Sequence, residues 1–118
     1  GKDMLDILKK TKIVINKHIE DTKYACNMRL FEGTGSGCLL ITDYKKDLEK
    51  LFHIDSEITA YNDDSQIIEK INFYLQNEKK RLKIAENGYK KTTAIHNYRN
   101  RINVLDKFLK KKLINKNK

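Results

Sequence analysis

Two short, uninterrupted apolar runs constrain the fold of this chain more than any other feature. They are Ile13-Val14-Ile15 and Cys38-Leu39-Leu40-Ile41, and polar residues flank both. A strand with one face in solvent alternates apolar and polar residues, whereas a strand buried on both faces is apolar throughout. A third run, Glu57 to Tyr61, carries Ile58 and Ala60. The three runs predict the strands of a parallel sheet.

Helical patterns separate these strands and follow them. We expect short helices over 3–10, from Met28 into a glycine cluster at 33–37, and over 47–52. Beyond Asn62 the pattern is helical only, and its expected apolar stripes are Ile67, Ile68, Ile71, Tyr74 and Leu75; then Leu82, Ala85 and Tyr89; then Tyr98, Ile102, Leu105 and Leu109. Gly88 either ends the second of these helices or lies inside it at a cost of about 1 kcal/mol. The order predicts an α/β fold, a partial Rossmann-like domain with a three-stranded parallel sheet, helical crossovers and two or three C-terminal helices.

Length and composition indicate one domain over residues 1–118, with residues 110–118 as a basic, flexible tail. No apolar run approaches the ~18 residues of a membrane span, and the N-terminus has no apolar signal-peptide core. Cys26 and Cys38 have no metal-ligand spacing, so we expect reduced thiols in a cytoplasmic protein. His18, His53 and His96 also lack such spacing, so we expect no metal.

The net charge of +9 makes nucleic acid a candidate partner, but its distribution weakens that interpretation. Residues 96–118 carry a net charge of +7, whereas residues 1–95 carry only +2. Only four of the 25 basic residues are Arg, the residue that readers of bases and phosphates favour. A solvated basic face is therefore favoured over a nucleic-acid surface, and contact with an anionic membrane surface is a third alternative.

Polar residues follow the first two predicted strands. Ligands of open α/β sheets bind outside the carboxyl ends of the strands, where Asn16-Lys17-His18 and Thr42-Asp43-Tyr44 should meet. The helix that Asn27 caps should begin there too. Arg29, in its first turn, would donate hydrogen bonds to a phosphate. Glu32, three residues later, could accept hydrogen bonds from a ribose, although physical chemistry alone slightly favours an Arg29–Glu32 surface ion pair.

The glycine cluster does not form a phosphate cradle. Gly33-Thr34-Gly35-Ser36-Gly37 matches neither GxGxxG nor GK[ST], and it follows a helix and precedes a strand. It predicts the end of a helix and a close helix–strand approach. No nucleophile motif is present, so the catalytic residues remain unknown.

The stretch from Asn27 to Asp43, NMRLFEGTGSGCLLITD, resembles the signature of group 1 glycosyltransferases, particularly the spore-maturation-type branch. The resemblance continues in DLEKLF (47–52), IAENGY (84–89) and HNYRNR (96–101), in the order and spacing of that family over about residues 12–109. Two departures stand out. Tyr24 occupies the position of a first glutamate that many relatives carry, and Leu39 stands near a common proline.

This resemblance implies a GT-B architecture, in which the chain is the latter part of the C-terminal, donor-binding domain. It implies that Glu32 contacts the ribose of a nucleotide-diphosphate sugar and that Asn27 and Arg29 lie near its phosphates or sugar. Asn16 and His18 match the preceding loop more loosely. No metal or other cofactor is implied, and the partners are the sugar donor and an acceptor domain elsewhere in the parent protein.

The leading hypothesis is therefore a glycosyltransferase fragment that binds the sugar donor and that alone does not turn over. Its donor-binding residues are Asn27, Arg29, Glu32, Asn16, His18, Thr42 and Asp43. The alternative is a non-enzymatic basic module that binds nucleic acid or an anionic membrane surface, such as the inner face of the cell membrane, through its C-terminal helix.

Overall fold

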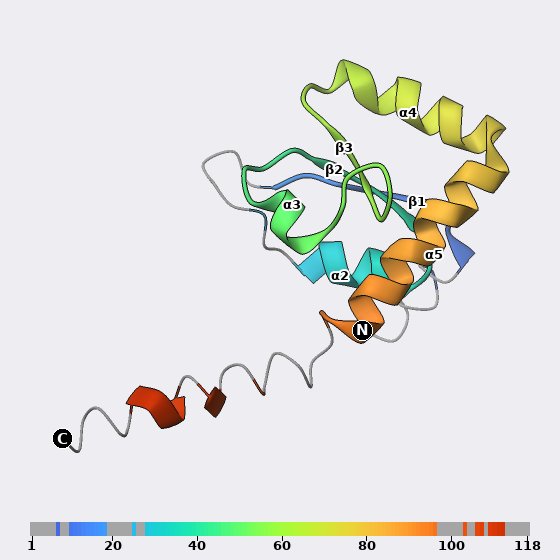
Figure 1. Ribbon diagram of the computed structural model, residues 1–118. Helices are drawn as coiled ribbons and strands as arrows, with labels where there is room; N and C mark the ends of the chain where they lie inside the picture. Colours follow the sequence, from blue (N-terminus) through green and yellow to red (C-terminus); the bar gives the residue numbers. More distant parts are fainter. Residues whose placement is uncertain are drawn as a thin grey trace.

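A computed structural model describes residues 7, 10–18, 25, 28–96, 103, 106–107 and 109–112. The elements alternate strand and helix and then become helical (Figure 1). They are β1 (Ile13–Asn16), α2 (Met28–Gly35), β2 (Leu39–Asp43), α3 (Leu48–Leu51), β3 (Thr59–Tyr61), α4 (Ser65–Gln76) and α5 (Glu78–Ala94).

The sheet has the order β1-β2-β3, and both strand pairs are parallel. Ile13 aligns with Leu39, and Ile41 aligns with Thr59, so the carboxyl ends of all three strands lie at one edge. The predicted fold class is confirmed. β2 begins and ends one or two residues later than its apolar run, because Thr42 and Asp43 continue the backbone pairing.

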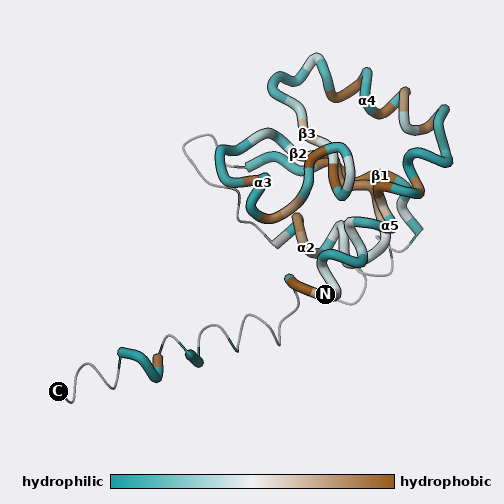
Figure 2. The backbone as a smooth tube through the Cα atoms, in the orientation of Figure 1, coloured by the Kyte–Doolittle hydropathy of each residue, from teal (hydrophilic) through white to brown (hydrophobic). Residues whose placement is uncertain are grey.

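Both faces of the sheet are covered by helices, as the unbroken apolar runs predict. Leu40 points into a cluster with Leu30, Leu48 and Phe52, from α2 and the α3 segment. Its neighbours Leu39 and Ile41 point into a second cluster formed with α4 and α5. In Figure 1, α4 lies on the opposite side of the sheet from α2, and Figure 2 shows apolar residues concentrated along the strands between them.

The glycine cluster ends α2 and lets it approach the sheet, as predicted. A Cβ on Gly33 would lie 3.2 Å from Cδ1 of Leu40, a tight contact that only glycine avoids. The helix runs on to Gly35, further than its apolar pattern suggests, and the chain then turns at Gly37 with φ +83°. That left-handed conformation favours glycine.

Helix α5 fastens one layer of the fold to the other. Gly88 lies inside this helix, where it packs against the Glu57 carbonyl and the Thr34 side chain. The Thr92 and Thr34 hydroxyls are 2.5 Å apart in a buried hydrogen bond between α5 and α2. Beyond the helix, the His96 ring contacts the Leu51 carbonyl at 2.6 Å. Gly88 is therefore required because the Glu57 backbone approaches α5 closely there, and not because the helix ends.

The predicted apolar stripes of α4 and α5 are partly wrong. Leu82 and Tyr89 are exposed, and α5 instead buries Arg81, Ile84, Ala85, Gly88 and Thr92. On α4, Tyr74 is buried whereas Ile68 and Leu75 are exposed. The reason is geometric: α5 leaves the sheet to reach α2, so its contacts follow the small residues Gly88 and Thr92.

Several predictions lie outside the described residues. They include Cys26, the Asn97 cap and most of the N-terminal helix, of which Ile7 and Lys10 are helical. The Cys38 thiol is buried, and burial raises its pKa. Within the described ranges, no helix combines the length and the apolar character needed to cross a membrane.

We expect Gly88→Ala to destabilise the fold, because the new Cβ would overlap the Glu57 carbonyl oxygen, which is backbone and cannot rotate away. The cost should reach at least the 1–3 kcal/mol or so typical of overpacking, despite the better helix propensity of alanine. Urea unfolding measures it. Gly35→Ala is the control, since its Cβ would meet only a methyl of Thr92 at 3.5 Å; equal losses in both variants would contradict the overlap.

Candidate functional site

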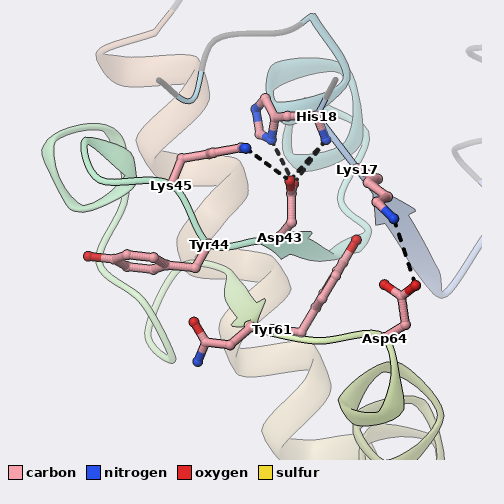
Figure 3. Close-up of a pocket in the computed structure, with 8 residues that line it drawn as sticks. Lys17, His18, Asp43, Tyr44, Lys45, Tyr61 and Asp64 are labelled. Carbon is pink, nitrogen blue, oxygen red and sulfur yellow. Dashed lines mark hydrogen bonds and ion pairs between the residues drawn. The ribbon is translucent and has the colours of Figure 1, made fainter. Parts of the chain in front are cut away.

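A pocket of about 270 Å³ opens at the carboxyl edge of the sheet (Figure 3). The segments that follow β1, β2 and β3 all contribute to it, which is the position where open α/β sheets bind ligands. Its lining residues are mostly polar or charged: Lys17, His18, Asp43, Tyr44, Lys45, Tyr61, Asn62 and Asp64.

Asp43, the last residue of β2, joins the ends of two strands. Its carboxylate accepts hydrogen bonds from the backbone N–H of His18 at 3.0 and 3.1 Å. The His18 ring nitrogen Nδ1 lies 2.7 Å from the same carboxylate. The His18 side chain is almost fully buried, and its Nε2 has no hydrogen-bond partner in the part of the chain that the structure describes. Asp43 thus fixes both the backbone turn after β1 and the orientation of the imidazole.

A second set of hydrogen bonds lies beneath this pair. The Asn16 amide donates to the Thr42 hydroxyl at 3.1 Å, and both residues are buried. The Tyr61 hydroxyl donates to the Asn16 carbonyl at 2.9 Å. The Thr42 hydroxyl in turn donates to Asp43 at 3.2 Å. The carboxyl ends of all three strands are therefore tied together by side chains as well as by the backbone ladder.

The charges of the site follow from this arrangement. Burial alone would raise the pKa of Asp43, but the hydrogen bonds from His18, the attraction to His18 and the Thr42 hydroxyl outweigh it, so the pKa lies below its usual range. The pKa of Tyr61 is raised by burial and by the negative charges of Asp43 and Asp64. Asp43 is thus an anion at neutral pH, and Tyr61 is a neutral donor.

The two lysines that line the pocket differ in how far their side chains are exposed. Lys17 is exposed at the rim, where its ammonium lies 3.7 Å from the Asp64 carboxylate. The Lys45 side chain is only 16% exposed, and its ammonium lies 3.9 Å from Asp43. In Figure 3 the dashed lines from His18 and from Lys45 converge on Asp43.

Arg29 and Glu32 lie on the first two turns of α2, outside the residues that line the pocket. The crossover places the start of α2 at the carboxyl edge, and just before it the buried Ala25 N–H donates to Asp47, which follows β2, at 2.5 Å. Arg29 is exposed and Glu32 is half-buried. No ion pair joins the two among the described residues. Asn27 lies outside them.

The structure thus brings together four of the seven predicted residues, namely Asn16, His18, Thr42 and Asp43. The sequence analysis did not select Lys45, Tyr61, Asn62 or Asp64. The last three could have been found, because the rule that ligands bind beyond strand ends applies equally to the strand ending at Tyr61. The same rule applies to Lys45, two residues beyond the end of β2, but the sequence does not show its burial, which depends on the path of the chain there.

The other histidines lie apart from the pocket. His53 is exposed, and His96 packs against the rings of Phe31 and Phe52, with centroid distances of 5.2 and 5.0 Å. Over the described ranges, no three His, Cys, Asp or Glu side chains are grouped so that they could hold a metal ion.

One comparison with known proteins identifies a family, and another identifies a similar fold. A family model described as glycosyl transferase-like matches residues 1–107. Among solved structures, the chain is similar to the C-terminal domain of a group 1 family glycosyl transferase, LpcC, from Francisella tularensis, with a TM-score of 0.69 and 20% sequence identity. The match covers 83% of this chain and 50% of that one, so this chain spans about half of that solved domain. No curated protein matches the sequence.

We expect Asp43→Asn to destabilise the chain at neutral pH by about 1.5–3 kcal/mol, the range for hydrogen bonds to a charged group. The folded-state pKa of Asp43 is lowered, so its contribution is complete above the ordinary Asp range and is lost as the pH falls below about 4. Urea unfolding of both proteins near pH 7 and near pH 3 should show the difference shrinking. Asp64→Asn, at the exposed rim, should lower the free energy of unfolding by no more than about 1 kcal/mol. If Asp43→Asn destabilised the chain equally at both pH values, the ionised Asp43 carboxylate would not be the source of this stability.

Proposed function

Since this chain belongs to the glycosyl transferase-like family, we propose that it is the latter part of a GT-B donor-binding domain and holds a nucleotide-diphosphate sugar. The observation that carries this proposal is the polar pocket at the carboxyl edge of a parallel sheet, built from the ends of all three strands. The activity of the parent protein is the transfer of that sugar to an acceptor bound elsewhere. The motif between Asn27 and Asp43 favours the spore-maturation-type branch.

In this proposal Arg29 and Glu32 contact different parts of the nucleotide. Arg29 lies in the first turn of α2, where the helix dipole favours an anion, and its guanidinium offers a bidentate fork to phosphate. Glu32, one turn later, accepts hydrogen bonds from the ribose hydroxyls. Asn27 precedes them and contributes near the phosphates or the sugar.

The tied strand ends form the rigid floor of the site. Asn16 and Thr42 are buried and bonded to each other, and the His18–Asp43 pair closes the turn after β1. A rigid floor of this kind keeps the groups that meet the departing diphosphate in place, so that they can stabilise its developing negative charge without rearranging during the reaction. The acceptor and its activating base belong to another part of the parent protein, so the chain alone binds donor and does not transfer the sugar.

The test is an NMR titration of this chain with UDP, GDP and TDP and their sugars. One nucleotide series should give saturable shifts at residues 29–32 and 42–45. In that series, Arg29→Ala or Glu32→Ala should weaken binding about tenfold or more, the loss expected for a hydrogen bond to a charged group.

The matched control is Glu49→Ala, which removes a carboxylate from an exposed position on α3 and should leave the affinity unchanged. Equal affinities in the wild type and in the Arg29 and Glu32 variants would refute the assigned contacts. The absence of saturable shifts with every nucleotide would refute donor binding by this chain.

A further inference from the structure

Lys45 is held in an unusual way for a lysine. Lysines normally keep the ammonium in water, as Lys17, Lys90 and Lys110 do here with side chains 54–72% exposed. The Lys45 side chain is 16% exposed and lines the pocket. A charge that is withdrawn from water costs free energy unless a partner compensates it.

The ion pair that Lys45 forms includes no hydrogen bond. Its ammonium lies 3.9 Å from the Asp43 carboxylate, which is too far for a hydrogen bond. Asp43 is already engaged at shorter distance by the N–H and the Nδ1 of His18. Among the described residues, none accepts a hydrogen bond from Lys45, so its three donors remain available to an anion in the pocket.

A second observation points to the same place. The His18 ring is buried, its Nδ1 side is occupied by Asp43, and its Nε2 has no hydrogen-bond partner among the described residues. A buried polar atom usually has a partner, so the unpaired Nε2 of a residue that lines the same pocket indicates a polar partner outside the described residues. His18 and Lys45 both reach Asp43, one from the end of β1 and the other from beyond β2 (Figure 3).

We infer that Lys45 is a second cation, besides Arg29, that contacts the diphosphate of the nucleotide-sugar donor, and that Asp43 is the positioning residue that holds Lys45 and His18 in place. This inference rests on the proposed function and adds to it a residue that the sequence pattern did not indicate. The ligand chemistry is a phosphate or diphosphate group, which lysine binds as a point charge.

The experiment titrates inorganic pyrophosphate, and then the nucleoside diphosphate and the free nucleoside, into ¹⁵N-labelled chain. Pyrophosphate should give saturable shifts at residues 17–18 and 43–45. Lys45→Ala and Lys45→Gln should weaken pyrophosphate and the nucleoside diphosphate at least fivefold and leave the nucleoside unaffected. Lys46→Ala is the matched control: it removes the same charge one residue away, at an exposed position, and should change affinity less than twofold.

The Asp43→Asn variant distinguishes a positioning role of the carboxylate from the simple effect of its negative charge. Removing a negative charge beside an anion site should tighten anion binding if the carboxylate only adds repulsion. If Asp43 positions Lys45 and His18, the same change should weaken pyrophosphate severalfold. Thermal unfolding confirms that each variant is folded, and the two Lys45 variants decide the matter if Asp43→Asn is not.

The outcomes separate this inference from the proposed function. Nucleotide binding that depends on Arg29 and Glu32 but not on Lys45 would overturn the inference and leave donor binding in place. Pyrophosphate binding that depends on Lys45, with no preference for any nucleotide, would keep the anion subsite and overturn donor binding. Equal effects of the Lys45 and Lys46 variants, or shifts confined to the lysines of α5, would show non-specific attraction and overturn the inference.

Discussion

The complete burial of strand β2 is the constraint on which the rest of this structure depends. Leu39, Leu40, Ile41 and Thr42 have no measurable exposure, because helices cover both faces and β1 and β3 pair with both edges. A buried backbone must satisfy every N–H and C=O, and a central parallel strand does so. The strand places Asp43 at the carboxyl edge, where its carboxylate accepts hydrogen bonds from His18, which follows the neighbouring strand β1.

Helix α5 gives this small sheet a stable frame for the site. It packs on one face through Ile84 and Ala85, and its later turns reach α2 on the other through Gly88 and Thr92. With both layers fastened at the amino edge of the strands, the carboxyl edge is left for polar side chains. The contacts between α5 and α2 therefore lie at the opposite end of the three strands from the polar pocket.

Much of this could be predicted from the sequence, and the reasons differ by residue. Continuous apolar runs predict strands buried on two faces, and Gly33 and Gly37 predict a tight turn, because both signals are local. Asn16, His18, Thr42 and Asp43 meet because parallel strands must end at one edge. The buried faces of α4 and α5 were predicted only in part, since an apolar period shows which residues can be buried but not which neighbour will cover them.

The sequence by itself determined the class of fold, the order of its elements, the edge at which polar residues gather and the family that its motifs resemble. Only the tertiary structure decided that Asp43 pairs with His18, that Lys45 is withdrawn from water, and that Gly88 lies against a backbone carbonyl. The physical reason is range. Strand and helix patterns arise from neighbouring residues, whereas these three contacts join segments about 25 to 31 residues apart or depend on the path of a turn, which only the packed chain fixes.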